Sequence, residues 1–341
     1  MRILFIANPV QNMYKDIEDE MIAQGHQVFI VKDKLFRADP YFAGRKYFRF
    51  LKRIVWKIEA EQYWDRMFEV TKELNEPFDF LFVISGTSVC RYLLDRLMSI
   101  NPQMRSSIYT WDSCNYYRFD RHLDYIDKGF NFDIDDVKKD DRWSLLPIYC
   151  RKKIIKQSGN CEFDIFSIGS NHDGRYSFIK KILPQLRESH TKFFIRIVTN
   201  PINLSLRGRI SLLFTSKSRR KEIKEEIAFS HGLENEDILS REKILAQEYD
   251  KISNSSACVL DDQRENQTGL TARFMWALAE GKKIITTNQS AYRYNFVNHE
   301  QVAIINKTKP YLPINFLKNS SYGRADISPF MVDNWVRTIL Q

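Results

Sequence analysis

Apolar residues along the chain recur with two spacings, and their alternation predicts an α/β protein. Short runs rich in β-branched and aromatic residues indicate buried strands. Between them lie longer polar segments with apolar positions three and four residues apart, which indicate amphipathic helices. The chain begins with a strand at residues 2–7, a helix at 14–23 and a second strand at 27–31. This order predicts a parallel sheet with helices on its faces.

The same alternation continues along the chain, and no internal repeat of the solenoid type is present. Further strands are expected at residues 78–84, 106–110, 130–132, 145–149, 162–168, 193–198, 257–260, 284–287 and 301–305. Helices are expected at residues 41–75, 89–99, 176–187, 221–230, 241–254, 269–280 and 331–340. Residues 201–220 are basic and irregular and fit neither pattern.

The length of 341 residues favours about two domains. A polar, basic segment at residues 151–160 indicates the connection between them. We therefore expect one α/β domain over residues 1–155, a second over residues 156–325, and a terminal helical segment over residues 326–341.

The formal net charge of +9 requires an anionic partner or another explanation. Nucleic acid, an anionic membrane surface and phosphorylated substrates are the candidates. No nucleic-acid-binding module is recognisable, so no nucleic-acid partner is expected. No apolar run approaches the roughly 20 residues of a membrane span.

The cysteines indicate a reducing compartment. They are scattered, odd in number and without zinc-ligand spacing: Cys90, Cys114, Cys150, Cys161 and Cys258. The first residues form a strand and do not resemble a signal peptide. We therefore expect a cytoplasmic protein that can associate peripherally with the inner face of the cell membrane.

The membrane expectation rests on residues 41–66, where basic and aromatic side chains are interleaved. They are Arg45, Lys46, Tyr47, Phe48, Arg49, Phe50, Lys52, Arg53, Trp56, Lys57, Tyr63 and Trp64. One interpretation is a set of amphipathic helices with a solvated basic face. The other is an interfacial surface that docks on anionic lipid.

Two polar stretches in the first half follow expected strands, where open α/β sheets bind ligands. Residues 85–88 follow one strand, and Asp112 follows the next. Asp112 is the carboxylate best placed to act as a catalytic base in this half. The alternative is that it caps a helix or a turn.

Small residues and a cation follow the first strand of the second half. Gly169 begins this stretch and Arg175 ends it. Such a stretch suits a contact to a phosphate or a nucleotide base, and it suits an ordinary turn equally well.

Residues 257–288 predict a strand, a polar loop, a helix and a further strand. Gly269 is expected at the helix N-terminus, where free N–H groups and the helix dipole favour an anion. Arg273 is one turn further and can add a charge-assisted contact, whereas Gly281 ends the helix. The alternative is a plain strand–helix–strand packing unit.

These residues resemble the donor-side motif of GT-B glycosyltransferases, in particular the group of capsular or lipopolysaccharide biosynthesis proteins. The similarity lies in Gly269, Leu270, Thr271 and Arg273, then Ala277 and Leu278, then residues 281–288. Residues 109–113, residues 130–133 with Asp136, and residues 164–169 with Arg175 are similar to the same group, in the same order. The likeness spans most of the chain.

The resemblance implies a GT-B fold, with two Rossmann-like domains facing across a cleft and a C-terminal helix that crosses back to the first. The domain at 1–155 would bind the acceptor, a surface-polysaccharide intermediate that is lipid-linked or an oligosaccharide. The domain at 156–325 would bind the nucleotide-sugar donor. No metal and no cofactor is expected, because a helix N-terminus and basic side chains stabilise the leaving diphosphate.

The implied donor-binding residues are Gly169, Arg175, Gly269, Leu270, Thr271, Arg273, Trp276 and Glu280. Trp276 stands where the family usually has a glutamate that binds the donor ribose. Tryptophan cannot accept a hydrogen bond, so Glu280 would replace that carboxylate, or Trp276 would stack on a base or sugar. A third interpretation is that Trp276 only packs and the donor site is altered.

Three functions are therefore compatible with the sequence. The first is transfer of a sugar from a nucleotide-sugar to a surface-polysaccharide acceptor. The second is a non-catalytic GT-B-like nucleotide-binding or scaffold protein, motivated by Trp276. The third is another GT-B enzyme such as a nucleotide-sugar epimerase.

Overall fold

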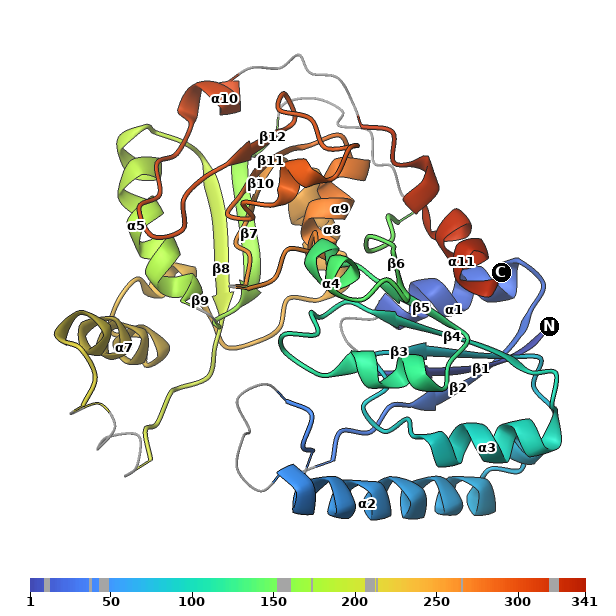
Figure 1. Cartoon of the computed structure of the whole chain (residues 1–341). Helices are drawn as coiled ribbons and strands as arrows, with labels where there is room; N and C mark the ends of the chain where they lie inside the picture. The colour runs from blue at the N-terminus through green and yellow to red at the C-terminus, as the bar shows by residue number, and fades with distance from the viewer. Residues whose placement is uncertain are drawn as a thin grey trace. The chain divides into compact units, whose positions relative to one another are not determined.

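The computed structural model describes residues 1–8, 13–36, 39–42, 49–151, 161–172, 174–205, 212, 214–264, 266–318 and 325–341. The chain divides into two compact units, each built on a six-stranded sheet (Figure 1). Unit 1 comprises Met1–Lys152, Asn266–Met275 and Asp326–Gln341; unit 2 comprises Lys153–Glu265 and Trp276–Ala325.

The sheet of unit 1 has the strand order β2-β1-β3-β4-β5-β6, and neighbouring strands are parallel. Its strands are β1 (Arg2–Ala7), β2 (Gln27–Lys32), β3 (Phe80–Ile84), β4 (Arg105–Thr110), β5 (Lys128–Asn131) and β6 (Trp143–Leu145). Its helices are α1 (Met13–Ala23), α2 (Arg49–Val70), α3 (Arg91–Ile100), α4 (Ile134–Lys139) and α11 (Val332–Leu340), with 3₁₀ turns η1 (Lys72–Asn75), η2 (Phe119–Asp124) and η5 (Ser328–Phe330).

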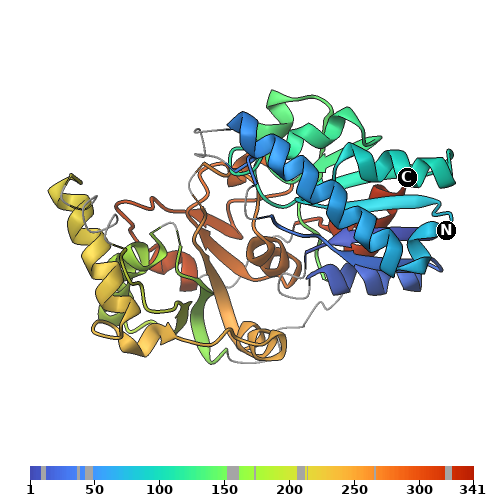
Figure 2. The same cartoon turned by 90° about the horizontal axis from the view of Figure 1, so that it is seen from below.

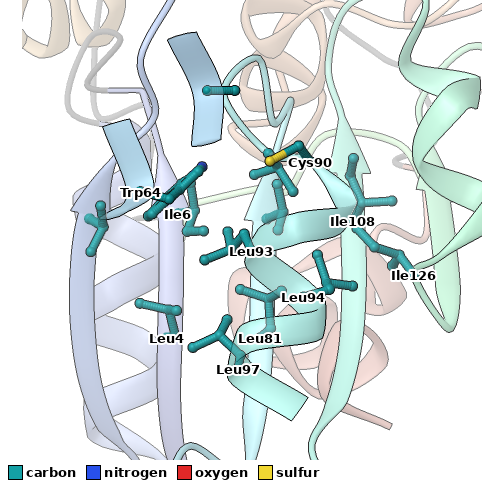
Figure 3. Packing of buried hydrophobic residues seen from close by; sticks show 14 of the residues in the cluster. Leu4, Ile6, Trp64, Leu81, Cys90, Leu93, Leu94, Leu97, Ile108 and Ile126 are labelled. Atoms are coloured by element: carbon teal, nitrogen blue, oxygen red, sulfur yellow. The ribbon is translucent and has the colours of Figure 1, made fainter. Parts of the chain in front are cut away.

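Alternating side chains of the central strands are buried on both faces of this sheet. Leu4 and Ile6 face α2 and α3, where they join a core with Trp64 (Figure 3). Figure 2 shows α2 running along this face with α3 beside it. The strands are therefore almost continuously apolar, as expected for a parallel sheet covered on both sides.

The terminal helix α11 packs on the opposite face of the same sheet. The Trp335 ring lies 4.7 Å from the Tyr109 ring and 6.2 Å from the Phe82 ring, centroid to centroid. Its indole Nε1 donates to the carbonyl oxygen of Pro147 at 3.0 Å. The predicted return of the C-terminal helix to the first domain is confirmed.

The sheet of unit 2 has the order β12-β11-β10-β7-β8-β9 and is also parallel. Its strands are β7 (Phe163–Ser170), β8 (Phe193–Val198), β9 (Leu239–Ser240), β10 (Ser256–Asp261), β11 (Lys283–Thr286) and β12 (Val302–Ile304). Its helices are α5 (Arg175–Glu188), α7 (Lys217–Ser230), α8 (Ala246–Asn254) and α10 (Ile314–Lys318), with 3₁₀ turns η3 (Glu236–Ile238) and η4 (Ala291–Arg293); the division between the units falls inside α9 (Ala272–Ala279).

Helices cover both faces of the second sheet as well. Side chains of α5 and Phe229 of α7 pack on one face with Ile165 and Leu260. On the other face, the Tyr249 ring of α8 lies 5.9 Å from Phe166 of β7. The predicted α/β class, with two doubly wound, Rossmann-like units, is confirmed.

Several boundaries differ from the sequence prediction. The strand expected at residues 145–149 ends at Leu145, and Pro147 has no N–H with which to extend the ladder. The helix expected at residues 241–254 begins at Ala246, and the Arg241 guanidinium donates to the carbonyl oxygens of Thr199 and Ser230.

The segment 266–275 belongs to unit 1, whereas the sequence assigned it to the second domain. The helix expected to begin at Gly269 also begins later, at Ala272. The hydroxyl Oγ1 of Thr271 accepts the N–H of Phe274 at 3.1 Å and so caps the helix. Before it, Thr268 and Gly269 donate hydrogen bonds to the Asp133 carboxylate.

The expected interfacial surface also needs correction. Trp56 and Trp64 are buried in the core under α2 and are not available to a membrane. Arg45, Lys46, Tyr47 and Phe48 lie outside the described residues, as does most of the expected connection at residues 151–160.

Candidate functional site

The sheet of unit 2 changes direction between β7 and β10. The chain runs from β7 outward through β8 to β9, and then returns to the other side of β7 to form β10, β11 and β12. The connections that follow β7 and β10 therefore diverge at the carboxyl edge of the sheet. In open α/β sheets this point opens a crevice that binds ligands.

Arg175 follows β7 at this edge. It is the first residue of α5, and Gly174 before it has a left-handed φ of 75° that turns the chain into the helix. Arg175 is only 4% exposed. Its Nε lies 3.5 Å from Asp262 Oδ2, so this predicted cation forms an ion pair with a buried carboxylate.

Asp262 directly follows β10 and binds a second cation. Its Oδ1 is 2.8 Å from Nζ of Lys307, which comes from the connection after β12. The same ammonium donates to the carbonyl oxygen of Gln263 at 2.8 Å, and Thr287 Oγ1 lies 3.5 Å from Asp262 Oδ1. We call Arg175, Asp262 and Lys307 the switch-point cluster.

The switch-point cluster places two cations beside one buried carboxylate. The carboxylate fixes the positions of the two cations, and cations at this edge of the sheet can bind an anionic ligand. Because Lys307 is more exposed than Arg175, an incoming anion would reach the ammonium first. A phosphate group is the type of ligand that this arrangement can bind.

The sequence identified one member of this cluster and missed two. Asp262 follows the predicted strand at 257–260, and its position after a strand was the available signal. Lys307 follows the last strand in a polar stretch without a recognisable motif, and no local pattern indicates its role.

Gly169 lies within β7, where it pairs with Ile197, because the strand continues to Ser170. It is therefore not part of the loop that precedes Arg175, although it lies near the carboxyl end of the strand. The predicted strand ended two residues earlier, at Ile168. In the structure, Gly169 and Ser170 also pair with β8.

Trp276 and Glu280 of unit 2 both contact α8. Trp276 is buried, and its ring lies edge-on to Tyr249 with centroids 6.2 Å apart. Glu280 accepts from Ser253 Oγ at 2.8 Å and pairs with Lys282 Nζ at 3.2 Å. Glu280 follows the C-terminus of α9, and helix C-termini in a strand–helix–strand unit lie at the amino edge of the sheet, opposite the switch-point cluster.

Gly269, Leu270, Thr271 and Arg273 belong to unit 1. The backbone N–H of Gly269 donates to Asp133 Oδ2 at 3.2 Å, and that of Thr268 donates to the same oxygen at 2.7 Å. The N–H group of Gly269, which was expected to bind a donor phosphate, therefore donates to a protein carboxylate. Leu270 is fully buried and is part of the hydrophobic core.

Asp133 begins α4 and organises this edge of unit 1. Its carboxylate also accepts the N–H groups of Asp135 at 3.0 Å and Asp136 at 3.3 Å, which caps the helix, and the hydroxyl of Thr268 at 2.5 Å. Because these groups come from segments far apart in sequence, Asp133 holds residues 268 and 269 against the sheet. Asp133 is part of the motif resemblance, but no local pattern in the sequence indicates this contact.

Asp112, the expected base, is half-buried at the carboxyl end of β4. Two residues later, the N–H of Cys114 donates to Asp136 Oδ2 at 2.6 Å. Burial raises the pKa of Asp136, the Cys114 N–H lowers it, and the nearby Asp133 carboxylate raises it further. The loop that carries Asp112 is therefore tied to a second buried carboxyl group.

Within the described part of the chain, no group of three or more His, Cys, Asp or Glu side chains is arranged to hold a metal ion. No helix among these same residues combines the length and apolar character needed to cross a membrane.

No protein-family model matches the sequence, and no curated protein matches it. Solved structures with a similar fold include MurG from Acinetobacter baumannii, with a TM-score of 0.45 and 9% identity over 100% of this chain and 95% of that chain. Another is the spinosyn rhamnosyltransferase SpnG complexed with thymidine diphosphate, with a TM-score of 0.44 and 11% identity over 100% of this chain and 92% of that chain. At these values the likeness carries no functional assignment.

Proposed function

We propose that this chain is a GT-B glycosyltransferase that moves a sugar from a nucleotide-sugar donor to a surface-polysaccharide acceptor. The observation that carries the proposal is the switch-point cluster of unit 2, which places cations where an α/β unit binds ligands. The two Rossmann-like units, the returning helix α11 and the motif resemblance of residues 269–288 support it further.

The proposed reaction is a displacement at the anomeric carbon of the donor sugar. An acceptor hydroxyl oxygen forms a bond to that carbon, and the bond from the carbon to the diphosphate oxygen breaks. The nucleoside diphosphate leaves with the electron pair, and its developing negative charge is stabilised by nearby cations. Lys307 and Arg175 would supply that stabilisation in unit 2.

Asp112 remains the proposed base, which takes the proton of the acceptor hydroxyl if the reaction inverts configuration. Arg273 remains a proposed diphosphate ligand, and the Arg273→Ala variant is expected to lose transfer while it stays folded. Gly269 has a lesser role in this proposal, because Asp133 already binds its N–H. Glu280 is assigned to the packing of α9 on α8.

The finer parts of the proposal concern the acceptor and the setting. We expect a lipid-linked or oligosaccharide acceptor, an activity that requires no metal or cofactor, and a protein at the cytoplasmic face of a membrane. The basic character of the chain, with its net charge of +9, supports an anionic acceptor or surface.

Nucleotide binding is the direct test. Calorimetry with uridine, thymidine, guanosine and adenosine diphosphates should identify one that binds the protein. Lys307→Gln should weaken that binding about tenfold or more, because it removes a cation from the phosphate site. Lys309→Gln, an exposed change two residues away, is the control.

A second candidate function is a non-catalytic nucleotide-binding or scaffold protein of the same fold. Trp276 packs on Tyr249 in the position of the family glutamate, and Asp262 already balances Arg175. If no nucleoside diphosphate binds, the transferase proposal fails and the scaffold is favoured. An epimerase would instead convert the donor in the absence of any acceptor.

A further inference from the structure

The first half of α2 exposes a stripe of apolar side chains. All five are exposed, with exposed fractions of 75% for Phe50, 58% for Leu51, 44% for Ile54, 44% for Val55 and 48% for Ile58. Residues four and eight apart lie on one side of a helix, so these five side chains form one continuous surface, which we call the α2 stripe.

The α2 stripe lies directly opposite the side of the helix that packs on unit 1. Trp56, Ala60 and Trp64 repeat every four residues and are buried. At 100° per residue, the direction of Ile58 is about 160° from that of Trp56. Packing on the sheet therefore satisfies one side of α2 and leaves its apolar stripe facing outward.

Basic side chains border the α2 stripe. Lys57 lies along one margin and Lys52 along the other, as their helical positions require. Arg53 points toward the packed side of the helix, where its guanidinium lies 5.9 Å from the centre of the Tyr41 ring. Glu61 partly balances Lys57, at 3.7 Å from Oε1 to Nζ. After Ile58, the exposed positions of the helix become mainly polar, so the apolar and basic surface is confined to its first half.

We propose that the α2 stripe is a docking surface for an anionic phospholipid membrane. An interfacial helix buries an apolar face among the acyl chains near the headgroups, while basic side chains at its margins contact anionic headgroups. The stripe and its margins have this arrangement. A second copy of the chain fits less well, because a symmetric contact between two stripes would bring their basic margins, with Lys52 and Lys57, close to each other.

This inference rests on the membrane setting in the proposed function and names the surface that would bind there, although membrane binding through α2 requires neither a nucleotide nor an acceptor. It also replaces the aromatic surface expected from the sequence. Among the described residues of α2, the two tryptophans are in the core, and the side chains of the α2 stripe are aliphatic apart from Phe50.

Co-sedimentation of the full chain with vesicles tests the proposal. We expect binding to vesicles of phosphatidylcholine with phosphatidylglycerol and little binding to phosphatidylcholine alone. The double change Ile54→Asn and Ile58→Asn should weaken binding about tenfold or more, since it removes two inserted side chains without changing charge. Lys52→Gln with Lys57→Gln should weaken binding about tenfold or more and reduce its salt dependence.

Two matched changes serve as controls, and both should bind as the unchanged chain does. Val70→Asn alters an apolar side chain, 67% exposed, at the other end of α2. Lys221→Gln removes an exposed cation on α7 of unit 2. Circular dichroism and thermal unfolding confirm that each variant is folded.

The proposal is overturned if the unchanged chain does not bind anionic vesicles, or if the Ile54 and Ile58 changes leave binding intact. Sedimentation equilibrium tests whether a second copy of the chain covers the stripe instead. If the chain does not bind vesicles but forms a dimer that these same changes dissociate, the stripe is a self-association surface. Nucleotide affinity is measured separately, so a failure here does not bear on the proposed transferase activity.

Discussion

The carboxylate of Asp133 and the backbone N–H of Gly269, 136 residues apart in sequence, are joined by a hydrogen bond of 3.2 Å. The same carboxylate binds Thr268 through its N–H and its hydroxyl. Both oxygens are fully buried, so this contact attaches the segment 266–275 to unit 1.

Removal of this carboxylate should destabilise unit 1. Asp133→Ala leaves the buried donors of Thr268 and Gly269 without an acceptor and uncaps α4, and we expect a loss of about 3 kcal/mol in the free energy of unfolding. Asp133→Asn keeps one acceptor oxygen and should cost less. Urea unfolding followed by tryptophan fluorescence measures both, with the exposed Asp141→Ala as control. An Asp133→Ala variant as stable as that control would contradict the structural role.

Gly269 is required by space and not by backbone conformation. A Cβ at this position would lie 2.3 Å from Cδ2 and Cε2 of Phe132. Gly269→Ala should therefore cost about 2 kcal/mol, because the ring must move within a packed core.

Shortening the opposing side chain should recover part of that loss. In a double-mutant cycle, Phe132→Leu should reduce the cost of Gly269→Ala by about 1 kcal/mol. Gly25→Ala is the matched control, because Gly25 has a left-handed φ of 84° and open space around its Cβ position. Its cost comes from the backbone, so Phe132→Leu should not change it. Equal behaviour of the two glycines would contradict the packing explanation.

The local patterns of the sequence predicted the two sheets well, because buried parallel strands are apolar over their whole length. They placed Arg175 correctly after β7. They could not indicate that Lys307 reaches Asp262, since nothing near Lys307 in sequence depends on that contact. The same limit applies to Gly269, whose glycine suited a phosphate-binding turn and a close approach to Phe132 equally well.

The switch-point cluster predicts an unusual response to loss of its carboxylate. Asp262→Asn leaves the cations of Arg175 and Lys307 close together without their counter-ion, and we expect a loss of about 3–5 kcal/mol in stability. An added anion can replace the missing charge. Nucleoside diphosphate or inorganic phosphate should therefore raise the melting temperature of Asp262→Asn more than that of the unchanged chain.

Thermal unfolding with and without ligand measures this difference. Glu242→Gln, an exposed change in the same unit, controls for the loss of one negative charge. If anions stabilise the unchanged chain and Asp262→Asn equally, the cluster is not a phosphate site. Destabilisation without any anion effect would support a purely structural ion pair.

His122 predicts how the stability of unit 1 depends on pH. The imidazole is fully buried, and its Nδ1 lies 2.6 Å from the hydroxyl of Tyr125. Burial lowers the pKa of His122 well below its ordinary value of 6.5, and the charge of Arg121 lowers it further. Below the ordinary pKa the unfolded chain binds a proton at this residue that the folded chain does not bind. Stability should therefore fall by about 1.4 kcal/mol per pH unit as the pH decreases below that value.

The contribution of His122 can be isolated by comparison with a side chain that does not titrate. His122→Gln should be less stable than the unchanged chain near neutral pH, because the polar amide fills the buried site poorly. Between about pH 5 and 6.5, however, its free energy of unfolding should depend on pH less steeply. The difference in slope should correspond to about one proton fewer taken up on unfolding. The same change at the exposed His231 is the control. Urea unfolding across this range gives the slopes, and identical slopes for His122→Gln and the unchanged chain would show that the folded state protonates His122 as readily as the unfolded state does.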